Sequence, residues 1–435
     1  MSLIPPRPNG KRHTCSSSSK SSGIISAPFS KDSDPSGSVA LSKNLFQGVY
    51  GPLAVYLHFP FCRNRCRYCD FYKEKYDRPG VERFFRAVEY ETELVLSLFG
   101  HEPIEIASIY IGGGTPSLIR PELLERWLEA LKSYGRLLPG YEFTVEANPE
   151  TLTADFAREA LALGINRVVI GVQSFRIESL RRLGRRQQTK DIYRAFYYAR
   201  LAGFENIGGD LIFGLPDQKT RHVKSDIERL IDLEPKHISF YQLTVEEKTP
   251  LFEDVKSGRI IIPGEDQAAQ MYRIGAHTLV DRGYRRYEVS NFARDGWRSR
   301  HNYAYWQGAP YIGLGPAAHG QVKDFRYANR PDLADYFEAV EKGLLPLGMI
   351  EELSEEQRLM ESVMLSLRTA DGLDKQQFII RFGAKALPIL EGATAGRLME
   401  AGYLVDDSGF IRLTDDGFLV ADKIIADLVG QSPST

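Results

Sequence analysis

From residue 53 onward, short β-branched apolar runs alternate with longer segments in which apolar residues recur every three or four positions. The first pattern is typical of buried strands and the second of amphipathic helices. The predicted strands are 53–59, 106–111, 141–147, 167–172, 206–213 and 237–243. The predicted helices include 121–134, 154–163, 190–201, 221–233 and 266–281. Six β-α units in series imply a parallel sheet, and six fall short of the eight of a closed barrel, so we expect an α/β fold built on a partial (β/α)6 TIM-like barrel.

The alternation breaks after residue 284. Residues 285–292, 301–306 and 311–320 are interpreted as strands and glycine-rich loops beside the barrel mouth, followed by a helix from about residue 332. Farther on, 402–405 and 410–413 flank the turn 406–409 and predict a β-hairpin in a helix-rich, winged-helix-like domain. The predicted domains are a Ser/Pro-rich tail at 1–48, the barrel at 49–283, the flanking segment at 284–350 and the C-terminal domain at 351–430.

Composition is that of an ordinary globular protein, with 43% hydrophobic residues, 26% charged residues and a formal net charge of −2 over 435 residues. This balance gives no overall electrostatic attraction for nucleic acid, although the basic stretch R-R-L-G-R-R at 181–186 needs an explanation. No apolar run approaches the length of a membrane span, so we expect a cytoplasmic protein. The tail has no acidic residue before Asp32 and is expected to be disordered; an organellar transit segment is the alternative.

Three of the four cysteines, Cys62, Cys66 and Cys69, lie within eight residues directly after the first predicted strand. Thiolates at this spacing can converge on one iron–sulfur cluster, and three ligands leave one iron of a [4Fe-4S] cluster open to another residue or a small molecule. A structural zinc site is disfavoured because it needs four ligands and no second pair exists. Three structural cysteines and a disulfide framework are the remaining alternatives. Cys15 lies among serines and is expected to be a solvated thiol.

The other predicted strands also end in unusual sequences. They are G-G-G-T-P at 112–116, E-A-N-P at 146–149, G-V-Q-S at 171–174, D-L-I-F-G-L-P at 210–216 and Y-Q-L-T at 241–244. In parallel β/α folds the ligand lies at the carboxyl ends of the strands, so these groups are expected on one face. The glycine run lets backbone groups approach a ligand closely, but it lacks the Gly-Lys-Ser/Thr of a phosphate loop.

In this order, the C-x3-C-x2-C, G-G-G-T-P, V-E-A-N-P, G-V-Q-S-F and D-L-I-F-G-L-P motifs resemble the radical S-adenosylmethionine (SAM) enzymes, specifically the oxygen-independent coproporphyrinogen III oxidase family. The resemblance covers about residues 52–430. It implies that the methionine amine and carboxylate of SAM bind the open iron. It also implies that one electron from the reduced cluster cleaves SAM to methionine and a 5′-deoxyadenosyl radical.

The resemblance carries roles over to matching positions, and it assigns no catalytic side chain. The positions that it places beside the cluster and SAM are Tyr56, Gly112, Gly113, Gly114, Thr115 and Glu146. Three more, Gln173, Arg185 and Asp210, line the same cavity, where some members hold a second SAM. Without the resemblance, an isolated Glu146 or Asp210 is more simply a loop cap or an ion-pair partner.

Two departures point to one branch of the family. Phe71 occupies the position where the oxidases have a further cysteine, and residues 1–50 lack the R-Y-T-S-Y-P-like segment that closes over their substrate. The sequences C-D-F-Y, G-V-Q-S-F, Y-Q-L-T-V-E and H-N-Y-A-Y-W resemble the heme chaperone (HemW) branch, which binds heme and SAM and is thought to deliver heme to acceptor proteins.

The H-N-Y-A-Y-W motif suggests where heme binds. His301 could be an axial ligand of the heme iron, and Tyr303, Tyr305 and Trp306 could supply aromatic surface. A turn-capping histidine among core aromatics is the alternative. His58 and His319 are further candidates for the heme ligand.

The expected function is therefore that of a heme chaperone with a SAM-ligated [4Fe-4S] cluster. Its expected partners are heme, heme-acceptor proteins such as respiratory enzymes, and an electron donor; membrane association is expected only through partners, and no nucleic acid is expected. The alternative is a coproporphyrinogen III oxidase that decarboxylates propionates by radical chemistry. A nucleic-acid-modifying radical enzyme rests on the winged-helix outline alone, and the overall charge disfavours it.

Overall fold

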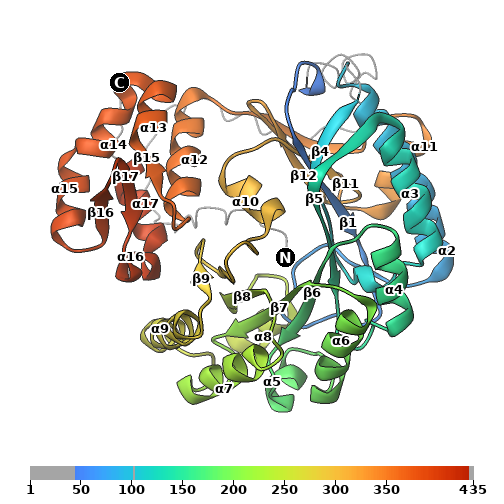
Figure 1. Ribbon diagram of the computed structural model, residues 1–435, viewed down its shortest axis with the longest axis horizontal. Coiled ribbons are helices and arrows are strands. Elements are labelled where there is room, and N and C mark those ends of the chain that lie inside the picture. The colour runs from blue at the N-terminus through green and yellow to red at the C-terminus, as the bar shows by residue number, and fades with distance from the viewer. Residues whose placement is uncertain (1–44, 101–102, 431–435) are drawn as a thin grey trace.

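The protein is described by a computed structural model that covers residues 45–100 and 103–430. The predictions for a tail and for Cys15 concern residues that lie, apart from 45–48, outside this description. The described chain forms a curved sheet with helices on its outer side and a separate helical lobe at the C-terminus (Figure 1).

The six predicted strands are present and pair in parallel in chain order. They are β1 (Leu53–Phe59), β4 (Ile104–Gly113), β5 (Gly135–Ala147), β6 (Arg167–Gln173), β7 (Asn206–Phe213) and β8 (His237–Gln242). Every residue of β1 and β6 is buried, which explains why these strands are mostly apolar rather than alternating between apolar and polar residues. The parallel sheet predicted from the alternation is confirmed.

Helices cover the outer face of this sheet (Figure 1). They are α2 (Arg78–Ser97), α3 (Pro121–Tyr134), α4 (Ala154–Ala162), α6 (Thr189–Ala202), α7 (Thr220–Ile231) and α9 (Glu265–Asp281), with a 3-10 turn, η1 (Pro116–Leu118). The shorter α5 (Ile177–Arg182) and α8 (Pro250–Lys256) lie beside the cysteine loop. Each of the longer helices buries one apolar stripe; in α3, for example, Leu124, Trp127 and Leu131 are almost fully buried. The predicted bounds of α3 match those observed, and the other predicted helix bounds differ by one or two residues.

Six further strands extend the sheet on both sides. They are β9 (Arg285–Arg286), β10 (Asn291–Ala293), β11 (Tyr311–Leu314), β12 (His319–Val322), β13 (Phe325–Asn329) and β14 (Leu347–Glu352), with α11 (Leu333–Glu341) packed against α2. β11 pairs in parallel with β1, whereas the other added strands are antiparallel. Within the described residues the sheet begins at β14 and ends at β9, so the barrel is open as predicted.

The interpretation of residues 301–306 as a strand or loop was wrong, because Arg300–Trp306 is a helix, α10. Ser299 caps its start by accepting a hydrogen bond from the Asn302 amide. The buried Glu142 carboxylate on β5 accepts hydrogen bonds from the hydroxyl of Ser299 and from the amides of Arg300 and His301. A carboxylate at the positive end of a helix dipole stabilises the helix, and this partner is distant in sequence.

The C-terminal lobe has its own hydrophobic core. Its helices are α12 (Glu355–Leu367), α13 (Lys375–Phe382), α14 (Leu387–Glu391), α15 (Ala393–Glu400), α16 (Asp415–Leu419) and α17 (Ala421–Val429), with η2 (Gly383–Ala386). The predicted hairpin is confirmed as β16 (Leu404–Asp407) and β17 (Phe410–Leu413), and β15 (Leu373–Asp374) completes a three-stranded sheet. Helices on a small sheet of this kind match the predicted winged-helix-like outline.

Backbone hydrogen bonds join this lobe to the barrel. The Val289 amide donates to the Arg368 carbonyl over 2.9 Å, and the Ala370 amide donates to the Tyr287 carbonyl over 3.0 Å. Arg286 also pairs with Asp415 on α16 over 2.5 Å. The segment after α12 therefore lies against the segment between β9 and β10.

Candidate metal and cofactor site

The cysteine loop is closed by a small parallel ladder directly after β1. β2 (Phe61–Cys62) pairs with β3 (Glu74–Lys75), and the Tyr76 amide donates to the Cys62 carbonyl over 2.9 Å. The three cysteines are free thiols, Cys62 buried and the other two half-buried. The ladder therefore fixes both ends of the loop that contains all three.

The glycine run at the end of β4 packs against this loop. The amides of Gly114 and Thr115 donate to the carbonyls of Phe59 and Phe61 over 2.6 and 2.9 Å. Gly113 has φ of +107°, and a Cβ on Gly114 would lie 2.6 Å from the Phe61 oxygen, so only glycine fits at either position. The Thr115 hydroxyl donates to Cys62 Sγ over 3.5 Å.

Arg185 closes the other side of the loop. Its Nη1 donates to Cys66 Sγ over 3.8 Å, and its Nη2 donates to the Gly171 carbonyl at the end of β6 over 2.9 Å. The turn before Arg185 packs on the loop, since the Arg67 amide donates to the Leu183 carbonyl over 2.9 Å. The predicted Arg185 and the cluster cysteines are thus brought together.

The predicted Tyr56 of β1 and Glu146 of β5 meet Tyr110 of β4 beneath the glycine run. A Cβ on Gly112 would lie 3.1 to 3.3 Å from Tyr110, Tyr56 and the Glu146 carboxyl carbon. The Tyr110 hydroxyl donates to Glu146 Oε1 over 2.7 Å. Glycine at position 112 therefore leaves room for three polar side chains to approach the loop from inside the barrel.

Gln173 and Asp210 extend the site across β6 and β7. Tyr241 on β8 donates to Gln173 Oε1 over 3.0 Å, and Gln173 has a positive φ of 63°. Non-glycine residues rarely adopt that conformation, and such strain concentrates at ligand sites. Asp210 is buried, burial raises its pKa, and its Oδ1 accepts no hydrogen bond from any residue in the described part of the chain. An unused buried acceptor is available to a ligand with N–H or O–H groups.

The chemistry of the donor set fits a cluster and SAM. Burial raises the pKa of the Cys62 thiol and of the Cys69 thiol. These thiols therefore lose their protons readily only when a metal takes the place of the protons. Within residues 45–100 and 103–430, no three His, Cys, Asp or Glu side chains are close enough to hold a single metal ion. Glycine backbone, the Thr115 hydroxyl and the Asp210 carboxylate supply the polar contacts that an amino acid and a nucleoside require.

His301 is buried beside this group, with its ring centroid 5.1 Å from that of Tyr110. Its Nδ1 is 2.9 Å from the Ser108 hydroxyl and its Nε2 is 2.8 Å from the Tyr305 hydroxyl. Burial lowers its pKa to about 3, so the ring is neutral at physiological pH. Both ring nitrogens are hydrogen-bonded, and a heme iron can reach His301 only after one of these bonds opens.

The other histidine candidates differ in their exposure. His58 is buried, and its ring nitrogens bond to the Tyr56 hydroxyl over 3.1 Å and to the Tyr72 carbonyl over 3.0 Å. His319 is half-buried on β12. His58 therefore resembles His301 in having both nitrogens occupied.

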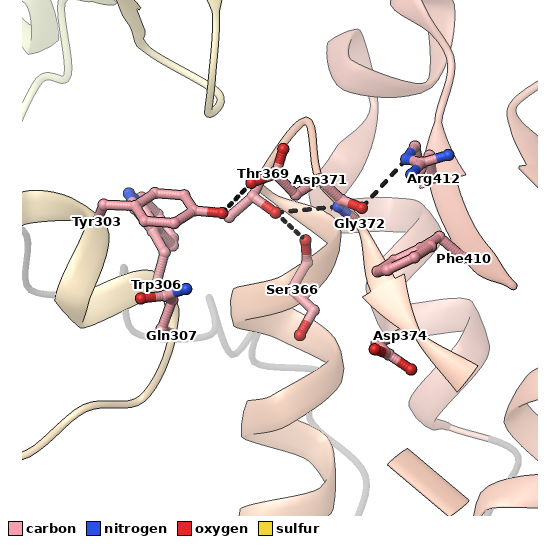
Figure 2. Close-up of a pocket in the computed structure, with 10 residues that line it drawn as sticks. All are labelled: Tyr303, Trp306, Gln307, Ser366, Thr369, Asp371, Gly372, Asp374, Phe410 and Arg412. Carbon is pink, nitrogen blue, oxygen red and sulfur yellow. Dashed lines mark hydrogen bonds between the residues drawn. The ribbon is translucent and has the colours of Figure 1, made fainter. Parts of the chain in front are cut away.

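The remaining part of the H-N-Y-A-Y-W motif faces a different space. Tyr303 and Trp306 line a cavity of about 450 Å³ between α10 and the C-terminal lobe, with Phe410 and Arg412 on the opposite wall (Figure 2). Tyr303 donates to Asp371, which also accepts from Arg298 over 2.9 Å. The motif thus divides between a buried histidine and an aromatic cavity wall.

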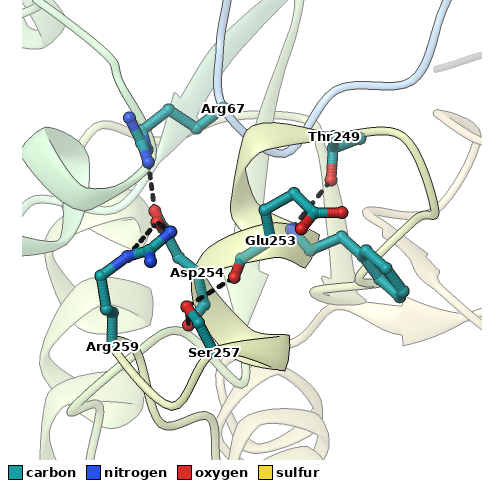
Figure 3. Close-up of polar contacts among 7 residues, drawn as sticks. Arg67, Thr249, Glu253, Asp254, Ser257 and Arg259 are labelled. Atoms are coloured by element: carbon teal, nitrogen blue, oxygen red, sulfur yellow. Dashed lines mark hydrogen bonds and ion pairs between the residues drawn. The ribbon is translucent and has the colours of Figure 1, made fainter.

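One group of functional contacts was not predicted. Asp254 on α8 accepts hydrogen bonds from Arg67, inside the cysteine loop, and from Arg259 over 2.8 Å (Figure 3). The Leu251 amide also donates to the Arg67 carbonyl over 3.0 Å. The position of Arg67 between two cysteines was a usable signal, whereas nothing in the sequence around Asp254 marks it.

Comparison with known proteins identifies the family. The Radical SAM superfamily profile matches residues 56–230, and the HemN C-terminal domain profile matches residues 353–420. The heme chaperone HemW of Bacillus subtilis is 33% identical over 381 residues, which are 87% of this chain and 99% of that protein. Radical S-adenosyl methionine domain-containing protein 1, mitochondrial, of Mus musculus is 34% identical over 395 residues, which are 87% of each chain.

A solved structure shares the architecture. Coproporphyrinogen III oxidase (HemN) from Escherichia coli superposes with a TM-score of 0.76 over 90% of this chain and 93% of that one, at 22% identity. This similarity confirms the partial radical SAM barrel with a helical C-terminal domain. Because relatives more than 30% identical match along nearly their whole length, the chain belongs to the heme chaperone HemW family of radical SAM proteins.

Proposed function

We propose that this protein binds heme and delivers it to acceptor proteins, and that it holds a [4Fe-4S] cluster through Cys62, Cys66 and Cys69. The observation that supports this most strongly is the similarity to heme chaperones over 99% of the length of the Bacillus subtilis protein. Phe71, in place of the further cysteine of the oxidases, supports the same branch.

The residues around the cysteine loop would hold SAM against the cluster. The backbone of Gly112, Gly113 and Gly114 and the Thr115 hydroxyl would bind its amino-acid part, while Tyr56 and Glu146 would fix its orientation from inside the barrel. Arg185, Gln173 and Asp210 would line the adjoining space, in which a second SAM is accommodated in some relatives. When bound, the cluster and SAM would supply one-electron cleavage of a carbon–sulfur bond.

For heme we propose contact with α10. The cavity wall formed by Tyr303 and Trp306 offers aromatic surface, which suits a porphyrin plane. His301 is the proposed axial ligand, and ligation through Nε2 requires that the hydrogen bond between Nε2 and the Tyr305 hydroxyl open first. Heme binding at this motif therefore implies a local rearrangement of α10.

Oxidase activity is the alternative function. The shared fold with coproporphyrinogen III oxidase supports it only as far as architecture, since 22% identity carries no substrate assignment. Product analysis with coproporphyrinogen III under anaerobic, reducing conditions separates the two functions, because only an oxidase releases protoporphyrinogen.

Cluster and heme binding can be tested together. The full chain is reconstituted anaerobically with iron and sulfide, titrated with SAM and heme by EPR and absorbance, and then mixed with an apo heme protein. We expect a cluster spectrum that SAM perturbs, a stable heme complex and transfer of that heme. Cys62→Ala, Cys66→Ala and Cys69→Ala together should abolish the cluster signal. Zinc or no metal at the thiols, or heme that never transfers, would refute the proposal.

The location of the protein and its acceptors remain proposals. Among the residues that the structure describes, no helix is both long and apolar enough to cross a bilayer. The relatives in Danio rerio and Mus musculus are named as mitochondrial. The cytoplasmic location, with an organelle as the alternative, stays a prediction, as do respiratory enzymes as acceptors and membrane association through them.

A further inference from the structure

Exposed arginines lie in the cysteine loop and in the turn that packs on it. They come from two sequence segments, C-R-N-R-C-R and R-R-L-G-R-R, and we call them the arginine rim: Arg63, Arg65, Arg181, Arg182 and Arg186. All five are exposed. The whole protein has a net charge of −2, so this concentration of positive charge is a local feature.

The two segments are adjacent in space because the turn between α5 and α6 packs on the cysteine loop. The Arg67 amide donates to the Leu183 carbonyl over 2.9 Å. A Cβ on Gly184 would lie 2.9 Å from Arg67 Cγ and 3.6 Å from the Arg65 carbonyl oxygen. Gly184 has φ of +74°, so the close packing and the backbone conformation both require glycine there.

The arginine side chains of R-R-L-G-R-R point in two different directions. Arg185 points inward, to Cys66 Sγ and the Gly171 carbonyl. Arg181, Arg182 and Arg186 are exposed. The inward arginine belongs to the proposed cofactor site, and the outward ones have no role in it.

Most of the rim's charge is not neutralised by neighbours. Arg65 is 3.6 Å from Glu74 and Arg182 is 2.5 Å from Asp217, but Arg63, Arg181 and Arg186 form no ion pair with any residue between 45 and 430 that the structure describes. Three unpaired guanidinium groups at a redox site attract a negatively charged partner surface and raise its rate of association.

Acidic residues gather at the other end of the cysteine loop. Glu246 and Glu247 follow β8, and Asp70 follows the last cysteine; the negative charges of Asp70 and Glu247 add to burial in raising the pKa of Glu246. This acidic group would repel the edge of an acidic partner. Positive charge at one end of the loop and negative charge at the other would fix the orientation as well as the position of a docked protein.

We infer that the arginine rim is the docking surface for an acidic one-electron carrier protein, which reduces the cluster from outside the barrel. This inference rests on the proposed cluster at Cys62, Cys66 and Cys69. In the step, the carrier loses one electron and the cluster gains it, and no bond or proton moves. The rim consists of arginines in the cysteine loop and in the turn that packs on it, so a carrier bound there would lie against the loop that holds the cluster ligands.

The test measures cluster reduction by reduced flavodoxin, an acidic flavin carrier, in a stopped-flow spectrometer. The rim variant Arg63→Glu, Arg181→Glu and Arg186→Glu is compared with the wild type. A matched control, Lys132→Glu, Arg285→Glu and Arg381→Glu, makes the same charge change on α3, β9 and α13. We expect the rim variant to slow reduction about tenfold or more at low salt and the control to change it by less than about twofold.

Two further conditions separate an effect on docking from an effect on the reduction potential of the cluster. At about 0.5 M salt the wild type and the rim variant should converge, because exposed charges are then screened within a few ångströms. Photoreduced deazaflavin, a small reductant with no docking surface, should reduce all three proteins at one rate. Equal rates with flavodoxin for wild type and rim variant, or an equal loss with deazaflavin, would overturn the inference.

Calorimetry with oxidised flavodoxin gives a readout that needs no cluster. The wild type should bind it, and the rim variant should bind it about tenfold more weakly at low salt. If reconstitution yields no cluster in any protein while this difference persists, the proposed function fails and the docking surface stands. If a single-stranded DNA 20-mer binds the rim more tightly than flavodoxin at about 0.15 M salt, the rim is a nucleic-acid site and the inference is wrong.

Discussion

The Tyr110 hydroxyl donates a hydrogen bond of 2.7 Å to Glu146 Oε1 inside the barrel, next to Gly112. Burial raises the pKa of Tyr110, so its hydroxyl stays protonated at every physiological pH. Glu146 is therefore held in one orientation by a donor on the neighbouring strand. The bond links β4 to β5 at the point where the proposed SAM site begins.

Replacing Tyr110 with Phe should weaken SAM binding without loss of the cluster. The substitution removes one donor from a carboxylate, and such bonds contribute about 1.5 kcal/mol or more, so the SAM dissociation constant should rise about tenfold. SAM titration of the reconstituted protein by EPR measures this. Tyr197→Phe, on the exposed side of α6, is the control and should leave the affinity unchanged. Unaltered affinity in Tyr110→Phe would show that Glu146 does not contact SAM.

Replacing Asp254 with Asn should loosen the cysteine loop. The variant removes the negative charge that Arg67 and Arg259 share, and the hydrogen bonds from both arginines now lower the pKa of Asp254. We expect cluster loss in air to be about threefold faster, with unchanged far-UV circular dichroism. Asp155→Asn breaks a similar but distant pair with Arg158 on α4 and should have no effect. Equal rates of cluster loss in both variants would show that α8 does not hold the loop.

Replacing His301 with Ala should destabilise the protein even without heme. The change removes two hydrogen bonds, leaves the Ser108 and Tyr305 hydroxyls without this partner, and opens a cavity, at a cost of about 2–4 kcal/mol. Urea unfolding of the heme-free chain measures this cost. His277→Ala, on the exposed side of α9, is the control. Full stability of His301→Ala, combined with loss of the heme Soret band, would mean that the side chain is a free ligand rather than a buried one.

The buried Glu91 should make stability depend on pH. It accepts hydrogen bonds from the Gly315 amide, Asn329 and Tyr336, yet burial raises its pKa to about 7. Because the pKa of Glu91 is higher in the folded than in the unfolded chain, protonation of Glu91 stabilises the fold. This stabilisation is complete below about pH 4.5 and is lost as the pH rises through 7.

Glu91→Gln removes that titration. The difference in unfolding free energy between variant and wild type should therefore shift in favour of the variant by up to about 3 kcal/mol between pH 4.5 and 7.5. Glu129→Gln, on the exposed face of α3, should show no such shift. Urea titrations at several pH values measure both. A difference for Glu91→Gln that is constant with pH would show that Glu91 is ionised in the folded protein throughout this range.

The barrel could be predicted from sequence because its strands are buried on both faces. Runs such as Val168–Ile170 in β6 are apolar and β-branched, and the helices between the strands show a clear three-to-four repeat. α10 could not be predicted in the same way. It has seven residues, four of them aromatic or histidine, and it is a helix because Ser299 and the distant Glu142 cap its first turn.

Some residues of the candidate site could likewise be predicted from the sequence, and others could not. Cys62 and Gly113 could be placed together because each stands at or beside the end of a predicted strand, and parallel strands end on one edge. Arg185 follows α5, and only the family resemblance placed it at the site. Asp254 could not, since it meets Arg67 only through the packing of α8 across 187 positions of chain. Whether the ring nitrogens of His301 are open to a ligand could not be predicted either. Two hydroxyl groups, from Ser108 and Tyr305, already occupy them.

The contact of 287–289 with 368–370 has a practical consequence for work on the barrel without its C-terminal lobe. Ending the chain near residue 350 would strip the Val289 amide and the Tyr287 carbonyl of their backbone partners and leave Arg286 without Asp415. Unpaired strand-like edges recruit other chains. A shortened version would thus self-associate, and its behaviour would report on the cut rather than on the native molecule.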